Sequence, residues 1–162
     1  LSARNIVKGV EAGKFAPEIK VTRADFLIMA MNAYGIEPGQ SIIDNFADAG
    51  SKYYTPYLAT AKSLGLVLGS GDNYYFPEIQ ISRQDMAVIL LRILDNIGEL
   101  PTGKGKKTLD VFKDKGEISD YANKAMAVFV EGEILSGFEN KLRPKDEATR
   151  AQAAQIFYNL LK

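Results

Sequence analysis

The stretch Val21-Thr22-Arg23-Ala24-Asp25 returns twice in the sequence, as Ile81-Ser82-Arg83-Gln84-Asp85 and as Ala148-Thr149-Arg150-Ala151-Gln152. The last four residues of each copy form a tetrad: a hydroxyl residue, an arginine, a variable residue, and an acid or amide. A proline stands six residues before the arginine every time, at positions 17, 77 and 144. A pattern that recurs at fixed spacing indicates three diverged copies of one structural unit.

The residues upstream of the tetrads repeat as well. Phe46-Ala47-Asp48 and Phe112-Lys113-Asp114 each precede a tyrosine and then an apolar pattern with helical spacing. A glycine-containing loop follows, so each repeat is predicted to be a helix, a loop, a proline and a capped second helix. Within a single domain, 1–162, we place repeat 1 at 1–42 (without its opening), repeat 2 at 43–106 and repeat 3 at 107–162.

The second helix of each repeat is apolar on most of its faces. These helices are expected at roughly 23–34, 83–95 and 150–161. A helix that is apolar nearly all round is a buried one. We therefore predict an all-α fold in which the three second helices pack as a central bundle with approximate threefold symmetry. The first helices are expected outside the bundle, with the loops projecting.

Composition argues against several classes of function. The 20 basic and 20 acidic side chains balance, so a global electrostatic attraction to nucleic acid is not expected. Cysteine and histidine are both missing, which removes thiolates and imidazoles as catalysts or zinc ligands. No apolar run approaches the ~18 residues that a membrane-spanning helix needs. We expect no metal site, no cofactor and no membrane insertion.

Each tetrad has the spacing of a helix-capping box. The hydroxyl is expected to accept a hydrogen bond from the N–H of the fourth tetrad residue, whose side chain bonds back. The predicted pairs are Thr22 with Asp25, Ser82 with Asp85, and Thr149 with Gln152. Capping does not explain the arginine, because a cation in the first helical turn opposes the helix dipole.

The arginines, Arg23, Arg83 and Arg150, therefore point to a second role for the helix starts. A helix N-terminus offers free N–H groups, and an arginine beside it adds a planar fork suited to a carboxylate or phosphate. This combination predicts a local anion pocket. The alternative is structural: the arginines form ion pairs with Asp48, Asp114 or another acid and fasten the repeats together.

Further candidate ligand contacts lie in repeat 2. Gly69, Ser70 and Gly71 belong to a turn-forming loop whose exposed N–H groups suit sugar hydroxyls, and 9–13 is the counterpart in repeat 1. Tyr53 and Tyr54 have flat rings suited to stacking on sugars. The alternatives are an ordinary turn for the loop and core packing for the tyrosines.

Together these residues resemble the S-layer homology domain family. The resemblance rests on the Phe-x-Asp sequence, the aromatic residue that opens the first helix, the glycine step, the proline and the tetrad, and it covers nearly the whole chain. It implies a pseudo-threefold bundle of three helix–loop–helix repeats whose lobes are separated by grooves. Two features depart from the family pattern: Asp25, Asp85 and Gln152 replace glutamate, and tyrosine replaces the usual tryptophan.

The resemblance also implies a function. In that family the grooves bind secondary cell-wall polysaccharides linked to peptidoglycan, often through a pyruvate ketal that supplies the anion. The tetrad arginines are the main contacts, and they correspond here to Arg23, Arg83 and Arg150. The implied protein is a secreted, non-catalytic anchoring module at the cell wall of Gram-positive bacteria, among others. It would be covalently part of a larger surface protein or extracellular enzyme.

Two other functions are alternatives to this one. A glycosidase needs two carboxylates that act as acid and base. The repeated acids stand at capping positions, which favour ionisation, so no enzymatic activity is expected. A protein–protein interaction or self-assembly module of a surface protein is the remaining alternative, and it would use exposed apolar surface.

Overall fold

The computed structural model describes residues 16–40, 44–102, 105 and 107–162. This part of the chain contains five α-helices and no β-strand, which confirms the all-α prediction. The α-helices are α1 (Arg23–Ala33), α2 (Thr55–Ser63), α3 (Arg83–Ile97), α4 (Asn123–Glu131) and α5 (Arg150–Leu160). Three short 3-10 helices precede α4, namely η2 (Leu109–Val111), η3 (Lys115–Glu117) and η4 (Asp120–Ala122).

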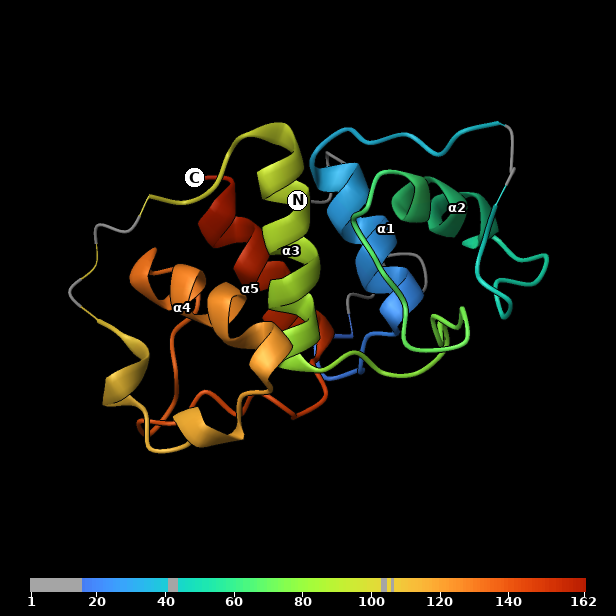
Figure 1. The fold of residues 1–162 in the computed structure, drawn as a ribbon. Coiled ribbons are helices and arrows are strands. Elements are labelled where there is room, and N and C mark those ends of the chain that lie inside the picture. The colour runs from blue at the N-terminus through green and yellow to red at the C-terminus, as the bar shows by residue number, and fades with distance from the viewer. Residues whose placement is uncertain (1–15, 41–43, 103–104, 106) are drawn as a thin grey trace.

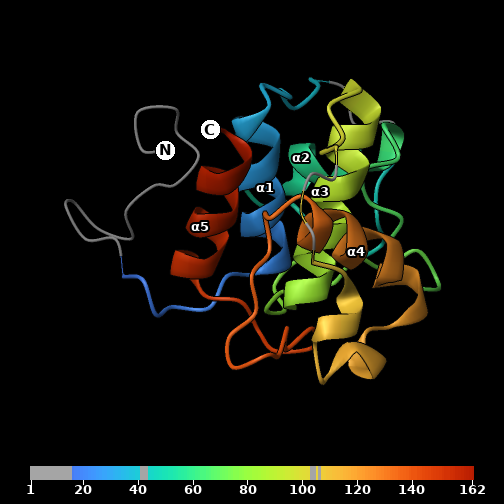
Figure 2. The same ribbon diagram turned by 90° about the vertical axis from the view of Figure 1, so that its left-hand side faces the viewer.

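The three second helices, α1, α3 and α5, form the predicted central bundle. They lie side by side with their N-termini at the same end of the molecule (Figures 1 and 2). Helix α1 contacts both of the others, and Phe26 of α1 stacks on Phe157 of α5 with ring centroids 5.6 Å apart. The first helices of repeats 2 and 3, α2 and α4, lie on opposite outer sides of the bundle (Figure 1).

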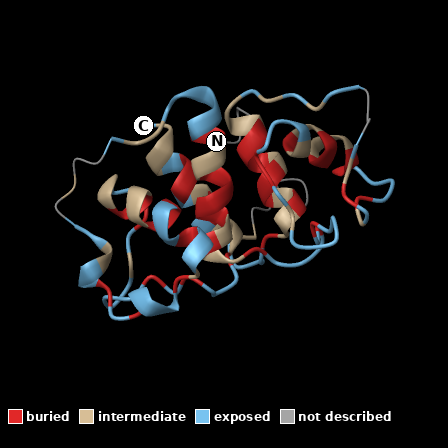
Figure 3. Cartoon of the chain, viewed as in Figure 1, coloured by how far each residue is buried: buried red, intermediate tan, exposed pale blue. Residues whose placement is uncertain are grey.

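The bundle is the hydrophobic core of the molecule. Figure 3 shows buried residues concentrated along its helices and on the inner faces of the outer ones. Leu27, Met86, Leu90 and Phe157 are all fully buried. The core forms here because these helices carry apolar side chains on nearly every face and have no other way to remove them from water.

Backbone hydrogen bonds join the start of each central helix to the loop of the next repeat. In every case the N–H of the tetrad arginine and that of the following residue donate to loop carbonyls, at the proline and two residues beyond it. The bonds, 2.8–3.0 Å long, are Arg23 N to Ile79 O, Ala24 N to Pro77 O, Arg83 N to Asp146 O, Gln84 N to Pro144 O, Arg150 N to Ile19 O, and Ala151 N to Pro17 O. The last pair returns to repeat 1, so the repeats close a ring.

The residue before each tetrad forms a second, smaller ring. The N–H of Val21 donates to Ala148 O at 3.0 Å, that of Ala148 to Ile81 O at 2.9 Å, and that of Ile81 to Val21 O at 2.9 Å. All three side chains are buried. A closed cycle in which every copy has the same role is what an approximate threefold axis requires, so the predicted symmetry is confirmed.

The Phe-x-Asp sequences hold the turns that precede the prolines. In these turns Phe76 and Arg143 have positive φ angles of 57° and 52°, which are uncommon outside glycine. The Asp48 carboxylate accepts hydrogen bonds from the N–H groups of Tyr75 and Phe76. Asp114 does the same in repeat 3. These acids therefore stabilise the loops that form the walls of the grooves described next.

Gly69 and Gly137 lie against the phenylalanines of the same sequences. A Cβ atom on Gly69 would lie 2.6 Å from the carbonyl oxygen of Tyr74 and 2.7 Å from the ring of Phe46. On Gly137 it would lie 2.4 Å from the ring of Phe112. Both positions need glycine because any side chain would collide with the ring or the backbone. Gly69 thus has a structural role whatever else it contacts.

Candidate ligand-binding grooves

Two grooves lie at equivalent positions between the repeats. Groove A, of about 540 Å³, is lined by residues that include Arg23, Leu68, Gly69, Phe76, Asp85 and Arg92. Groove B, of about 530 Å³, is lined by the corresponding residues Arg83, Ser136, Gly137, Arg143, Gln152 and Asn159. The repeat relation therefore extends from the bundle to the surface, with different side chains at the equivalent positions.

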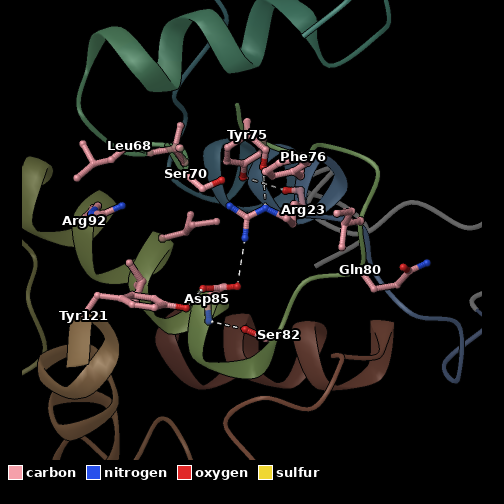
Figure 4. Close-up of a pocket in the computed structure, with 15 residues that line it drawn as sticks. Arg23, Leu68, Ser70, Tyr75, Phe76, Gln80, Ser82, Asp85, Arg92 and Tyr121 are labelled. Carbon is pink, nitrogen blue, oxygen red and sulfur yellow. Dashed lines mark hydrogen bonds and ion pairs between the residues drawn. The ribbon is translucent and has the colours of Figure 1, made fainter. Parts of the chain in front are cut away.

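In groove A, Arg23 is held by three contacts (Figure 4). Its Nε donates to the carbonyl oxygen of Tyr75 at 3.0 Å, and its Nη1 lies 3.1 Å from Oδ2 of Asp85. The guanidinium carbon lies 4.7 Å from the centroid of the Tyr75 ring. Arg23 belongs to repeat 1 and both partners belong to repeat 2. This is the structural interlock that the sequence left open, with Asp85 as the acid.

Asp85 also contacts repeat 3. The hydroxyl of Tyr121 donates to its Oδ1 at 2.8 Å, and one repeat earlier the hydroxyl of Tyr53 donates to Oδ1 of Asp25 at 2.7 Å. The two acids thus bond to the following repeat, and the predicted return bonds of their capping boxes are wrong. Gln152 does make its return bond, accepting from Thr149 N–H at 3.1 Å.

The hydroxyl caps are present at all three helices. Thr22, Ser82 and Thr149 each accept a hydrogen bond from the N–H of the fourth tetrad residue. The first two N–H groups of each helix donate to the next repeat, as described above. The expectation of free N–H groups at the helix starts is therefore wrong, and any anion binding in the grooves must depend on side chains.

Arg83 occupies in groove B the position that Arg23 has in groove A, but without an acidic partner. Its Nε donates to the carbonyl oxygen of Leu142 at 2.8 Å. Gln152 replaces the acid, and within the described residues no carboxylate lies at ion-pair distance from Arg83. Burial lowers the pKa of the Arg83 guanidinium, while Asp146 acts in the opposite direction. The group remains a cation at neutral pH, and its terminal nitrogens face the groove without a hydrogen-bond partner in the described chain.

The charges around the two grooves also differ. Groove B has four cations, Lys20, Arg83, Lys141 and Arg143, against the acids Asp146 and Glu147. Groove A has two cations, Arg23 and Arg92, against Asp85. Apolar side chains fill most of the rest of groove A, so it offers a less polar environment than groove B.

Sequence reasoning missed Arg92. It lies on α3 seven residues after Asp85, a spacing that places both on one helix face. The corresponding residues of the other repeats are asparagines, Asn32 and Asn159. The sequence could have indicated Arg92 through this difference, because one repeat has a cation where the other two have an amide.

Only some of the predicted loop and tyrosine residues line a groove. Gly69 and Ser70 line groove A, but Gly71 is not among its lining residues, and the Ser70 N–H donates to Tyr74 O at 2.8 Å within the turn. Sugar stacking by Tyr54 is wrong, because this residue is 3% exposed and packs in the core. Tyr53 is 64% exposed but lies outside both grooves.

Part of the predicted site lies outside the described residues. The 9–13 loop of repeat 1, next to which the groove of Arg150 is expected, falls within 1–15. In the described part of the chain, no cluster of acids has the arrangement of a metal site. None of the helices described there is long and apolar enough to cross a bilayer.

Three linked helical repeats with grooves between them define a class of repeat-built binding modules. The chain belongs to the S-layer homology domain family, which matches residues 1–27, 45–87 and 111–154. The matched segments contain the three tetrads in register. Membership of this family makes the chain an extracellular module associated with the cell wall.

The relatives are large surface proteins and enzymes. An amylopullulanase of Thermoanaerobacterium thermosulfurigenes is 31% identical over the whole of this chain, as is the exoglucanase XynX of Acetivibrio thermocellus. The S-layer protein sap of Bacillus anthracis is 29% identical over 96% of it. The chain spans 9%, 15% and 18% of these proteins, respectively. It therefore corresponds to a small part of each of these proteins.

Proposed function

We propose that this module anchors a larger surface protein or extracellular enzyme to the cell wall by binding an anionic secondary cell-wall polysaccharide. The polymer is linked to peptidoglycan and carries its negative charge on a pyruvate ketal. Grooves A and B take the anionic sugar, with Arg23 and Arg83 on their walls. Arg150 takes the corresponding position in the third groove. The module performs no chemistry on the polymer.

The observation that carries this proposal is the state of Arg83. A partly buried guanidinium has lost much of its hydration, and a missing partner leaves that loss uncompensated. The terminal nitrogens of Arg83 lie in a groove where cations outnumber acids. A carboxylate is the group that such a planar fork binds best. A sugar bearing one carboxylate would therefore gain a charge-assisted contact that the folded chain itself does not supply.

The test is a pull-down of the purified chain with cell-wall sacculi. Sacculi are used before and after chemical removal of the secondary polymer, and binding should be lost on removal. Arg83→Gln should bind intact sacculi less well than the parent. Lys124→Gln, which removes an exposed cation of α4 that lines neither groove, should bind like the parent.

Binding that survives removal of the polymer would contradict the proposal. Equal losses for the two variants would show diffuse electrostatic adsorption in place of a groove site. A mass that rises with protein concentration, without affinity for sacculi, would instead support a self-assembly module. Sedimentation equilibrium on the same samples measures that mass.

A further inference from the structure

The geometry points to Arg92 as the residue that contacts the anion of the ligand in groove A. This inference rests on the proposed function, since it names the contact by which one of the two grooves holds the anionic sugar. Arg92 lies in α3, outside the repeated tetrads. The two arginines of groove A then have different roles: Arg23 fastens the repeats together, and Arg92 binds the anion of the ligand.

The first argument is the difference in partners between the two arginines of groove A. Arg23 has a carbonyl, a carboxylate and an aromatic ring. Arg92 lines the same groove and is partly buried, yet it has no hydrogen bond, ion pair or ring contact in the described chain. Burial lowers the pKa of its guanidinium, and Asp85 acts in the opposite direction. A partly desolvated cation without a partner is stabilised when an anion binds beside it.

The second argument is that Asp85 does not satisfy Arg92. The carboxylate of Asp85 is already bonded on both oxygens, to Arg23 and to Tyr121. Arg92 is two helical turns further along the same face of α3. In Figure 4 it lies on the far side of the groove from Phe76, with the Arg23–Asp85 pair between them. Of the two cations that line groove A, Arg23 is therefore already paired with a protein acid and Arg92 is not.

The third argument comes from groove B, which offers the matched comparison. The residue equivalent to Arg92 is Asn159, whose side-chain amide donates to the carbonyl oxygen of Ile134 at 3.1 Å. The Asn159 side chain is therefore uncharged and already hydrogen-bonded within the chain. Arg83, in turn, has no acidic partner equivalent to the Asp85 that pairs with Arg23. The cation without an acidic partner is therefore Arg92 in groove A and the tetrad arginine Arg83 in groove B.

The walls beside Arg92 indicate the chemistry of the ligand. Leu68 and Ile79 are 68% and 53% exposed although they are apolar, and Phe76 stacks on Tyr74 with centroids 5.7 Å apart. Phe76 also lines the groove. Its backbone has a positive φ angle, a conformation that residues other than glycine rarely adopt. Apolar walls next to a cation suit a carboxylate that carries a small alkyl group or lies beside the apolar face of a sugar ring.

The experiment titrates the isotopically labelled chain with the pyruvate ketal of a methyl hexopyranoside, followed by two-dimensional NMR. The backbone amides of Gly69 and Gly137, which line grooves A and B, report the two grooves separately. The control ligand is the isopropylidene ketal of the same sugar, in which a methyl group replaces the carboxylate. Arg92→Gln and Arg92→Lys are compared with the parent, and thermal unfolding checks that each variant is folded.

Arg92→Gln should weaken ketal binding at the Gly69 reporter by about tenfold or more, with the Gly137 reporter changed by less than about twofold. Arg92→Lys should recover part of the loss, because it keeps the charge without the planar fork. The neutral ligand should bind parent and Arg92→Gln alike. A parent-like affinity at Gly69 in folded Arg92→Gln overturns the inference and leaves the proposed function intact. If the parent binds the ketal no better than the neutral ligand at either reporter, the proposed function fails and the inference with it.

Discussion

Grooves A and B share equivalent backbone hydrogen bonds but differ in how their charged side chains are paired. In both, an arginine from the preceding tetrad donates its Nε to the carbonyl of the residue two before the proline. In groove A an acid then neutralises that arginine, and in groove B an amide stands in the same place. A single carboxylate decides whether the arginine fastens two repeats or remains available to a ligand.

This difference shows how diverged repeats separate structure from binding. The rings of backbone hydrogen bonds are the same in all three copies, so the arrangement of the repeats does not depend on the side chains that differ between the grooves. The side chains that face the grooves are therefore less constrained. Groove A has an ion pair and a second cation further along α3, whereas groove B has an arginine without an acidic partner among other lysines and arginines.

The largest expected effect comes from damage to the scaffold that both grooves share. Phe157 is fully buried and stacks on Phe26, so Phe157→Ala should lower the free energy of unfolding by about 3–5 kcal/mol. Both grooves should lose affinity in proportion to the unfolded fraction. The matched control is Tyr158→Ala on the exposed face of α5, which should cost less than about 1 kcal/mol. Urea denaturation measures both, and a neutral Phe157→Ala would refute the bundle.

The next effect separates the two tetrad arginines. Arg23→Ala removes an ion pair, a bond to the Tyr75 carbonyl and a ring contact, so it should lower the unfolding free energy by about 1.5–3 kcal/mol. Arg83→Ala loses one hydrogen bond within the described chain and should cost about 1 kcal/mol of folding stability. For polymer binding the order reverses, with the larger loss at Arg83.

Thermal unfolding and polymer affinity should be measured on the same two proteins. If Arg23→Ala and Arg83→Ala shift both quantities equally, the contrast between an interlocked and an available arginine does not hold.

The helices of the bundle could be predicted from the sequence because they depend on local patterns. Apolar periodicity placed the three second helices, and α1, α3 and α5 begin at the arginines of the tetrads as expected. The hydroxyl caps were equally local. The family motif in turn indicated the grooves and the arginines on their walls.

The partners in the grooves could not be predicted, because they join residues far apart in the chain. Asp25 and Asp85 stand where a capping box would use them, yet the folded chain places Tyr53 and Tyr121 beside them and offers a stronger alternative. Arg92 was overlooked because its meaning depends on the groove and on the amide at Asn159. Tyr54 and Tyr53 are adjacent in sequence, and only the packing shows which of them is buried.

Exchanging the acid and the amide at the fourth tetrad position should exchange the ligand affinities of the two grooves. Gln152→Glu places an acid opposite Arg83 and should lower ligand affinity in groove B by about fivefold, or about 1 kcal/mol. Folding should change little, because the new ion pair with Arg83 offsets the return bond that Gln152 now makes to the Thr149 N–H. Asp85→Asn should raise affinity in groove A by a similar factor, because it releases Arg23. NMR titration at Gly69 and Gly137 measures both, and unchanged affinities would remove the acid as the cause of the difference.

The smallest expected effect is a dependence of groove B on acid pH through Asp114. Burial alone would raise the pKa of this carboxyl, but hydrogen bonds from the N–H groups of Leu142 and Arg143, with its own N–H and nearby Lys141 also contributing, hold the pKa below its usual value. A carboxyl whose pKa is lower in the folded state stabilises the fold above the unfolded pKa, near 4. That contribution is lost as the pH falls through the folded pKa. Leu142 also carries the carbonyl that accepts from Arg83, so protonation should loosen the arginine of groove B.

Asp114→Asn tests this coupling, because it keeps an acceptor at the same position and removes the titration. It should lower the unfolding free energy at neutral pH by about 0.5–1 kcal/mol. It should also flatten the decline in stability between roughly pH 4 and pH 2 relative to the parent. The measurement is a series of urea denaturation curves across that range. Parallel declines in parent and variant would show that the decline comes from other carboxyls, and that Asp114 positions the wall of groove B by geometry alone.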